Sequence, residues 1–162
     1  HISFINTLDS IIWMAEGRKY EEVVLMTASL ARLLRQSISN EDEVVPLARE
    51  VEYAKGYLTI QKMRYKDKLE FEIDVEPSIL NIPLIKLVLQ PIIENAIYHG
   101  LKYKESKGLL QVKGFMKDGN AVLQVIDNGV GMDEETLSHI YDKHKVNYHS
   151  NGVGVYNVQK RL

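Results

Sequence analysis

The sequence predicts an α/β fold in which helices come first and a mixture of strands and helices follows. From Phe4 to Tyr65, apolar residues recur at the spacing of one face of a helix. From Leu69 the segment LEFEIDV instead alternates apolar and acidic residues, which indicates a strand with one face in water. Because the period changes just before Leu69, we predict two domains, residues 1–66 and residues 67–162.

The first domain is predicted to contain a helical hairpin and a third helix. The apolar pattern from Phe4 to about Ser37 is interrupted at Gly17, which favours a break between two helices. A third helix is predicted from about Leu47 to Tyr65, because the φ angle of Pro46 suits the start of a helix.

The second domain is predicted to mix strands with two helices. Asp118-Gly119 stands between two alternating segments, and this dipeptide favours a tight β-hairpin turn. A polar stretch, residues 133–151, follows the second of these segments. The predicted elements are strands at 69–75, about 109–116 and about 121–127, a long helix from about Leu84 to Leu101, and a last helix that begins near Gly152.

The composition excludes several classes of function. The 162 residues carry a formal net charge of -2, which leaves no broad basic surface for nucleic acid or anionic lipid. The absence of cysteine removes disulfides, thiolate catalysis and cysteine-ligated zinc. The five histidines lack the paired spacing of a metal site, and no segment approaches the roughly twenty apolar residues of a membrane span. We expect a globular protein that binds no nucleic acid and meets a membrane only through segments absent from this chain.

The predicted long helix carries polar residues that packing alone does not require. In LQPIIENAIYHG, Gln90 and Glu94 are four residues apart, and so are Asn95 and His99. Side chains at this spacing lie above one another, so two neighbouring polar rows share one broad face. That face is either exposed to water or part of a binding site, and the helix alone does not decide between the two.

A second group of candidate residues follows the segment AVLQVID. Asp127 ends the predicted strand, and the sequence continues with Gly129 and Gly131. A carboxylate at a strand end can accept a hydrogen bond from a ligand amine, and glycines let the backbone approach a flat ligand. The alternative is a type I′ turn at Asn128-Gly129. An EF-hand is excluded, because acidic residues are missing at alternate positions after Asp127.

The third candidate segment, Asn151-Gly152-Val153-Gly154-Val155, is predicted to open the last helix. A glycine-rich turn before a helix presents free backbone N–H groups to a phosphate. Flexible loops also precede many helices, so this segment alone does not identify a phosphate site.

The order and spacing of these segments resemble the Bergerat ATP-binding superfamily, which holds histidine kinases and the DNA gyrase, Hsp90 and MutL ATPases. QPIIENAIYHG resembles its asparagine box, DNGVGM its first glycine box and NGVGVYNVQKRL its second. With FINTL and YLTIQKMRY, these segments are similar to the LytS-like sensor histidine kinases. The resemblance implies a helical region for dimerisation and histidine phosphotransfer (1–66), followed by an ATP-binding two-layer α/β sandwich of the Bergerat type (67–162).

The resemblance implies roles for the polar residues of the long helix. Asn95 would supply its side-chain oxygen to Mg²⁺, a hard ion whose other ligands are water and nucleotide phosphates. Glu94 would act as a catalytic base or hydrogen-bond acceptor for the histidine that is phosphorylated. His99 would line the phosphate side of the site.

It also implies roles for the two glycine boxes. Asp127 would bind the adenine amino group of ATP, and Gly129 and Gly131 would let the nucleotide approach the backbone. Gly152 and Gly154 would hinge the segment between the boxes as a lid and offer backbone donors to the phosphates.

The start of the sequence departs from the family pattern. The family carries its acceptor histidine just before the triplet NTL, in a run such as PHFLYNTL, whereas this chain reads HISFINTL. Counting back from Asn6 places Ile2 at the acceptor position, and matching Phe4 places Ser3 there. One residue is about 100° of helix rotation, so His1 could serve only after a change of register or fraying of the first turn. His1 stays a candidate catalytic residue, with an unrelated terminal histidine as the alternative.

The implied function is the ATP- and Mg²⁺-dependent protein-histidine kinase core of a two-component sensor. It would form a homodimer, autophosphorylate a histidine and pass the phosphoryl group to an aspartate in the receiver domain of a response regulator. Two alternatives stay open: a nucleotide-binding dimerisation module without kinase activity, and a Bergerat ATPase. Because the family continues past KRL, we expect a chain truncated at both ends, from the cytoplasmic portion of a bacterial inner-membrane receptor.

Overall fold

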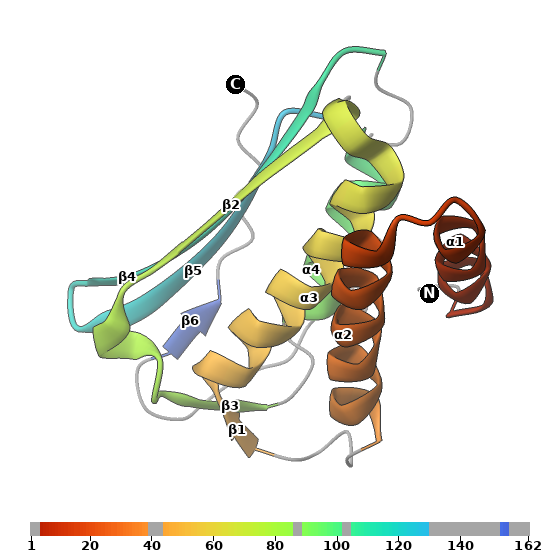
Figure 1. Ribbon diagram of the computed structural model, residues 1–162. Helices are drawn as coiled ribbons and strands as arrows, with labels where there is room; N and C mark the ends of the chain where they lie inside the picture. The colour runs from red at the N-terminus through yellow and green to blue at the C-terminus, as the bar shows by residue number, and fades with distance from the viewer. Residues whose placement is uncertain (1–3, 39–43, 86–88, 102–104, 130–152, 156–162) are drawn as a thin grey trace.

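The protein consists of a helical hairpin beside an α/β unit. The computed structural model describes residues 4–38, 44–85, 89–101, 105–129 and 153–155. In Figure 1 the helices α3 (Leu47–Tyr65) and α4 (Leu89–Asn95) lie on one side of a twisted sheet, and the hairpin stands beyond α3. The prediction of helices followed by a mixed α/β unit is confirmed.

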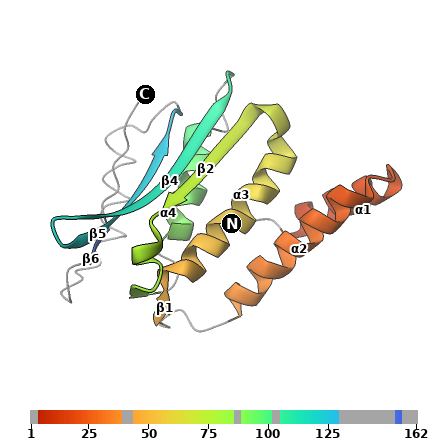
Figure 2. The ribbon, with the colours of Figure 1, turned by 60° about the vertical axis from the view of Figure 1, so that its left-hand side comes forward.

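The hairpin is formed by α1 (Phe4–Glu16) and α2 (Tyr20–Ser37), which pack against each other. The predicted break at Gly17 is confirmed. The reversal also requires Arg18, whose φ of 58° lies in the left-handed region, and the Arg18 N–H donates to the Ala15 carbonyl at 3.0 Å. Figure 2 shows the hairpin projecting away from the α/β unit. Among the described residues, none of the helices is long and apolar enough to cross a membrane.

Helix α3 joins the hairpin to the α/β unit. It begins directly after Pro46, as predicted, and contacts α2 as well as α4 and the first strand of the sheet. Its residues Leu58 and Ile60 are fully buried. A Cβ atom on Gly56 would come within 3.4 Å of Leu33 Cδ2, so the glycine lets α2 and α3 approach closely.

The prediction of a single long helix from about Leu84 to Leu101 is wrong. Strand β3 (Pro83–Ile85) occupies its beginning and pairs antiparallel with β1 (Val44–Pro46). The helix is described from Leu89 to Asn95 as α4 and continues from Ala96 to Leu101 as the π-helical turn η3. Pairing with β1, which is distant in sequence, satisfies the backbone of β3, and local periodicity carries no information about such a partner.

The sheet has four strands in the order β2-β4-β5-β6. The pair β2–β4 is parallel, β4–β5 is antiparallel, and β5–β6 is parallel. The strands are β2 (Leu69–Val75), β4 (Gly108–Lys117), β5 (Asn120–Asp127) and β6 (Val153–Val155).

Two local predictions within the sheet are confirmed. Strand β2, at one edge of the described sheet, buries Leu69 and exposes Glu72 and Asp74, as the alternation of LEFEIDV predicted. Asp118 and Gly119 join β4 to β5 with φ angles of 51° and 77°. Positive φ at both central residues is the requirement of a type I′ hairpin turn.

Residues 153–155 form strand β6, where the sequence had predicted the start of a helix. Gly154 lies opposite Val122 of β5 in a parallel pair. Val153 and Val155 are β-branched and therefore favour an extended backbone, and the free edge of β5 supplies hydrogen-bond partners. Residues 156–162, where that helix would continue, lie outside the described residues.

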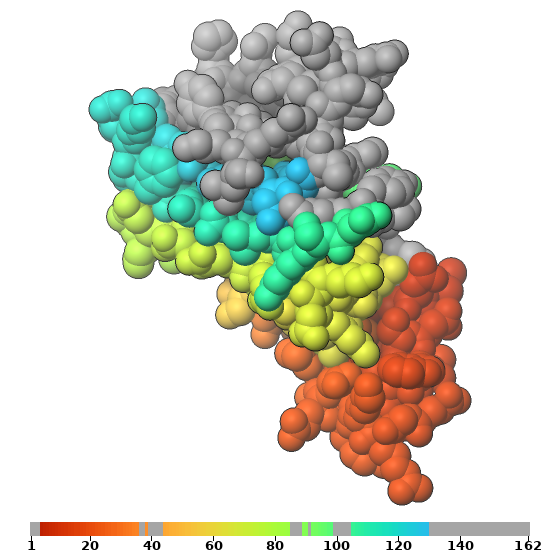
Figure 3. Space-filling model, turned by 90° about the horizontal axis from the view of Figure 1, so that it is seen from above, coloured from red at the N-terminus to blue at the C-terminus, as the bar shows by residue number. Residues whose placement is uncertain are grey.

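The core of the α/β unit lies between α3 and the sheet. Gly114 of β4 belongs to this layer, because a Cβ atom there would lie 2.9 Å from both Ile79 Cδ1 and Val75 Cγ1. Figure 3 shows the hairpin, red to orange, at one end of the molecule and the sheet away from it. Fully buried side chains of this core include Leu58, Ile60, Leu69, Ile79, Leu110 and Val112.

Candidate active site

The start of α4 is held by a carboxylate from α3. The backbone N–H of Leu89 donates to Glu50 Oε2 at 3.0 Å, and Glu50 is only 3% exposed. The first turn of a helix has unpaired N–H groups and the positive end of the helix dipole, so a buried carboxylate is well placed there. Pro91 in the same turn has no N–H to satisfy. Sequence reasoning missed Glu50, because its partner lies 39 residues away.

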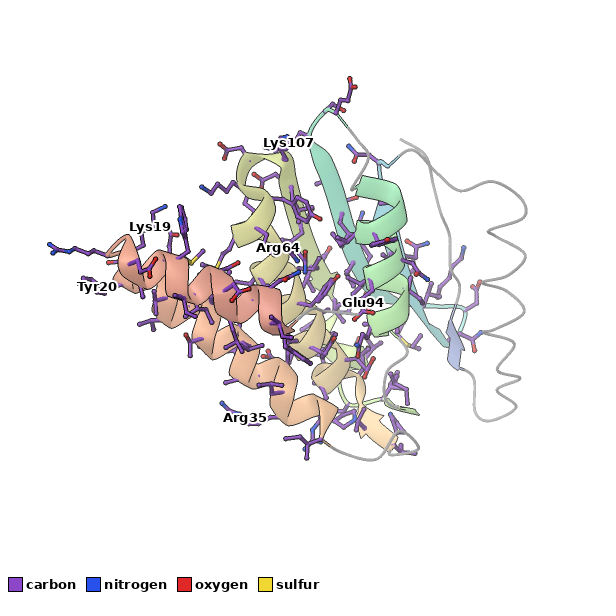
Figure 4. The ribbon with its side chains drawn as sticks, turned by 90° about the vertical axis from the view of Figure 1, so that its right-hand side faces the viewer. Lys19, Tyr20, Arg35, Arg64, Glu94 and Lys107 are labelled. Atoms are coloured by element: carbon purple, nitrogen blue, oxygen red, sulfur yellow. The ribbon has the colours of Figure 1, made fainter. Side chains whose placement is uncertain are left out.

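Glu94 lies on α4 and faces α3, as Figure 4 shows. The amide of Gln90 donates to Glu94 Oε1 at 2.9 Å, so the two residues lie in one row along the helix, as their spacing predicted. The hydroxyl of Tyr53, on α3, donates to the same oxygen at 3.4 Å. Glu94 is half-buried, so the purely solvent-exposed alternative does not hold for this residue.

The two tyrosines beside Glu94 are held in their neutral form. Burial raises the pKa of the Tyr53 hydroxyl far above its ordinary value, and the negative charge of Glu94 raises it further. Burial, followed by the charge of Glu94, also raises the pKa of Tyr57. The two rings stack with centroids 6.4 Å apart and planes inclined by 8°. Tyr53 is therefore a hydrogen-bond donor to Glu94 and not a second negative charge.

Asn95 is the last residue of α4 and is half-buried. It follows Glu94 by one residue, which is about 100° of rotation, so the two side chains leave the helix in different directions. The π-helical turn η3 begins at the next residue, contains the backbone of His99, and contacts β4 and β5. Such turns widen a helix locally and are frequent at functional sites. The side chain of His99 lies outside the described part of the chain.

Asp127 ends β5, as predicted, and is 6% exposed. Its Oδ1 accepts a hydrogen bond from the Gly129 N–H at 2.8 Å, which closes a tight turn over the carboxylate. The next strand paired with β5 is parallel, so Asn128-Gly129 does not form the two-residue hairpin considered as an alternative. Within the described residues, no hydrogen bond joins Asp127 to Glu94 or Asn95.

Asn128 was not predicted as a site residue, although it fixes the turn. Its Oδ1 accepts from the Leu109 N–H at 2.7 Å, and its own N–H donates to the Leu109 carbonyl at 3.2 Å. Its amide also donates to the Lys107 carbonyl at 3.4 Å. These bonds tie the residue after Asp127 to the start of β4, so the buried carboxylate has a defined place at the end of the sheet.

The remaining predicted site residues are only partly described. His1, Gly131 and Gly152 lie outside the described residues. Gly154 lies in β6, so it does not open a helix. Among the described residues, no cluster of three or more histidine, aspartate or glutamate side chains could hold a metal ion by itself. A metal held through Asn95 would therefore need ligands from a nucleotide and water.

Residues 81–162 match the family model of the histidine kinase-, DNA gyrase B-, and HSP90-like ATPases. The chain belongs to this ATPase family. The segment of the ATPase model contains Glu94, Asn95 and Asp127, and it is the ATP-binding domain of the family. Residues 4–69 match a second model, that of histidine kinases, and include Glu50 and Tyr53.

Several curated relatives of this ATPase-family chain are sensor kinases. Over 157 residues, the chain is 31% identical to the sensor histidine kinase YesM of Bacillus subtilis, covering 97% of this chain and 26% of the relative. It is 34% identical over 136 residues to the sensor protein LytS of Oceanobacillus iheyensis, covering 82% and 23%. It is 30% identical over 137 residues to the sensor protein kinase HptS of Staphylococcus aureus, covering 83% and 26%. The chain thus spans about a quarter of the length of these relatives.

Proposed function

We propose that the chain is the catalytic core of an ATP- and Mg²⁺-dependent protein-histidine kinase. One ring nitrogen of a histidine bonds to the γ-phosphorus of ATP while the bond from that phosphorus to the bridging oxygen of ADP breaks. The imidazole proton passes to Glu94, and an aspartate of a response-regulator receiver domain later takes the phosphoryl group. The observation that carries this proposal is the succession of a histidine kinase segment and an ATPase segment in one chain.

The nucleotide is proposed to bind through Asp127 and Asn95. The buried carboxylate of Asp127, held at a strand end, suits the adenine amino group, which donates hydrogen bonds. The amide oxygen of Asn95 is the hard type of ligand that Mg²⁺ takes beside phosphates and water. Bound Mg²⁺ would neutralise charge on the transferred phosphoryl group. His99 is proposed to line the phosphate side.

The glycines are proposed to shape the rest of the nucleotide site. Gly129 supports this role, because its N–H already shapes the turn over the Asp127 carboxylate. Gly131 is proposed to allow close approach of the nucleotide. Gly152 and Gly154 are proposed to hinge a lid and to offer backbone donors to phosphates.

A homodimer is proposed to form through the hairpin. Both of its helices expose large apolar side chains, and an apolar surface of this kind marks an interaction site. In a bacterial sensor, this dimeric core would lie on the cytoplasmic side, where ATP is available. The exposed residues are Phe4, Ile5, Leu8, Ile12, Trp13, Tyr20, Val24, Leu25, Leu34 and, directly after α2, Ile38.

The second candidate function is a nucleotide-binding dimerisation module without kinase activity. It is favoured by one observation: the sequence HISFINTL has no histidine at the position where the resemblance expects the acceptor. A Bergerat-type ATPase, which turns ATP over without a phosphoprotein, is the third.

Incubation of the chain with γ-labelled ATP and Mg²⁺ separates these functions. A kinase yields an acid-labile phosphoprotein. Binding of ADP and Mg²⁺, seen as a rise in melting temperature without any phosphoprotein, refutes the kinase and supports the binding module. Steady release of labelled phosphate without a phosphoprotein supports the ATPase.

A further inference from the structure

Helix α3 makes two polar contacts with α4 from residues that are three positions apart. Glu50 accepts from the N–H of Leu89 at the start of α4, and Tyr53 donates to Glu94 further along it. Residues at this spacing lie on the same face of a helix. The two contacts together fix the position of α4 along α3, and therefore the position of Glu94.

Two hydrogen bonds to Glu94, from different helices, share one acceptor oxygen, Oε1. The Gln90 amide contributes the bond of 2.9 Å and the Tyr53 hydroxyl the bond of 3.4 Å. A carboxylate with one oxygen held by two donors from different helices cannot turn freely about its last torsion angle. The direction of its second oxygen, Oε2, is fixed as a consequence.

The Tyr53 hydroxyl is itself well placed for this task. Tyr53 is 5% exposed, and its ring stacks on that of Tyr57. A buried ring with stacked neighbours has little freedom, so its hydroxyl occupies a defined position. Because the hydroxyl stays neutral beside the carboxylate, it donates and does not repel.

We propose that Tyr53 is a positioning residue for Glu94. Through Tyr53, helix α3 of the histidine kinase segment orients the carboxylate that accepts the imidazole proton of the phosphorylated histidine. This inference rests on the proposed kinase function. It adds a residue that lies outside the ATPase segment, at residues 81–162, and outside the segments that resemble the nucleotide-binding boxes.

The test is Tyr53→Phe, which removes the hydroxyl and keeps the ring. At saturating ATP and Mg²⁺, we expect the rate of phosphoprotein formation to fall about tenfold, the effect of one lost hydrogen bond to a charged group. The dissociation constant for ADP with Mg²⁺ should stay unchanged, because the hydroxyl of Tyr53 bonds to Glu94 and, among the described residues, to neither Asn95 nor Asp127. Tyr65→Phe is the matched control: it removes a phenol from the same helix, and its rate should equal that of the unsubstituted chain.

Combining Tyr53→Phe with Glu94→Gln shows whether the hydroxyl acts through Glu94. In the Glu94→Gln background, loss of the hydroxyl should slow the remaining reaction less than twofold, because its partner charge is already gone. Equal slowing in both backgrounds overturns the positioning role. An equal loss in ADP binding and rate, or an unchanged rate for Tyr53→Phe, overturns it too. If the unsubstituted chain forms no phosphoprotein, the proposed kinase function fails first and the positioning role falls with it.

A double-mutant cycle measured on the free energy of unfolding in urea tests the same contact without ATP. Non-additive effects of Tyr53→Phe and Glu94→Ala on the unfolding equilibrium are expected, because each change removes one partner of their hydrogen bond. Additive effects show that the bond is absent and overturn the inference even in an active kinase.

Discussion

Replacing Glu50 tests whether α3 holds the start of α4. In Glu50→Ala, the Leu89 N–H loses its acceptor in a site where Glu50 is 3% exposed. A buried N–H without an acceptor costs about 1–3 kcal/mol. Loss of a negative charge at the helix start costs about 0.3–1 kcal/mol more. We therefore expect the free energy of unfolding to fall by roughly 1–4 kcal/mol.

Two further variants separate the causes of this loss. Glu50→Gln keeps an acceptor oxygen and removes the charge, so it should lose less than half as much as Glu50→Ala. Glu52→Ala is the control, because Glu52 lies on the same helix with a side chain 54% exposed, and its ion pair with Arg32 is 3.6 Å long. That change should cost less than about 0.5 kcal/mol. Urea unfolding followed by circular dichroism measures all three. Equal losses for Glu50→Ala and Glu52→Ala would refute the capping role of Glu50.

One further change tests the proposed nucleotide site, and three others follow from the structure. Asn95→Ala should abolish the rise in melting temperature caused by ADP and Mg²⁺, while changing the melting temperature without ligand little. Gly114→Ala should lower the free energy of unfolding by about 1–3 kcal/mol, because the added methyl enters a filled core. Lys66→Gly should raise it by about 1 kcal/mol, because Lys66 has a φ of 50° and a ψ of -123°. Hydrogen bonds from Lys62 and Lys107 hold the pKa of Glu70 below its ordinary value of 4.5. The contribution of these bonds to the free energy of unfolding is present above pH 4.5 and lost as the pH falls through the lowered pKa. Glu70→Gln should therefore flatten this part of the plot of melting temperature against pH.

Each of these changes has an outcome that contradicts it. Asn95→Ala that unfolds the chain, while the folded fraction still binds ADP and Mg²⁺, removes Asn95 from the site. A neutral Gly114→Ala shows that the core has room for a methyl group. Lys66→Gly that destabilises shows that the lysine side chain matters more than its backbone. Parallel acid profiles for Glu70→Gln and the unsubstituted chain show that the pKa of Glu70 is not lowered.

Features determined by neighbouring residues were predictable from the sequence. The Asp118-Gly119 turn, the break at Gly17 and the alternation in β2 depend on local backbone preference and period, and all three are confirmed. The shared row of Gln90 and Glu94 was predictable for the same reason, since both lie four residues apart on one helix.

Features that depend on distant partners were not predictable. Glu50 and Tyr53 reach partners 39 and 41 residues away, and neither carries a motif that names its partner. The segment at Gly154 fits both a turn before a helix and a short strand, and only the free edge of β5 decides for the strand. The roles of all the predicted site residues stay predictions, and His1, Gly131 and Gly152 also lie outside the described residues.

The acidic side chains along β2 bear on how two copies of the chain can meet. Glu72 and Asp74 project into water from the outermost strand of the described sheet. If the β2 strands of two copies paired edge to edge, their carboxylates would lie opposite each other. Like charges in this arrangement oppose strand pairing. Repulsion between these carboxylates therefore opposes the association of two copies of the chain through β2, and the proposed homodimer uses the helical hairpin instead.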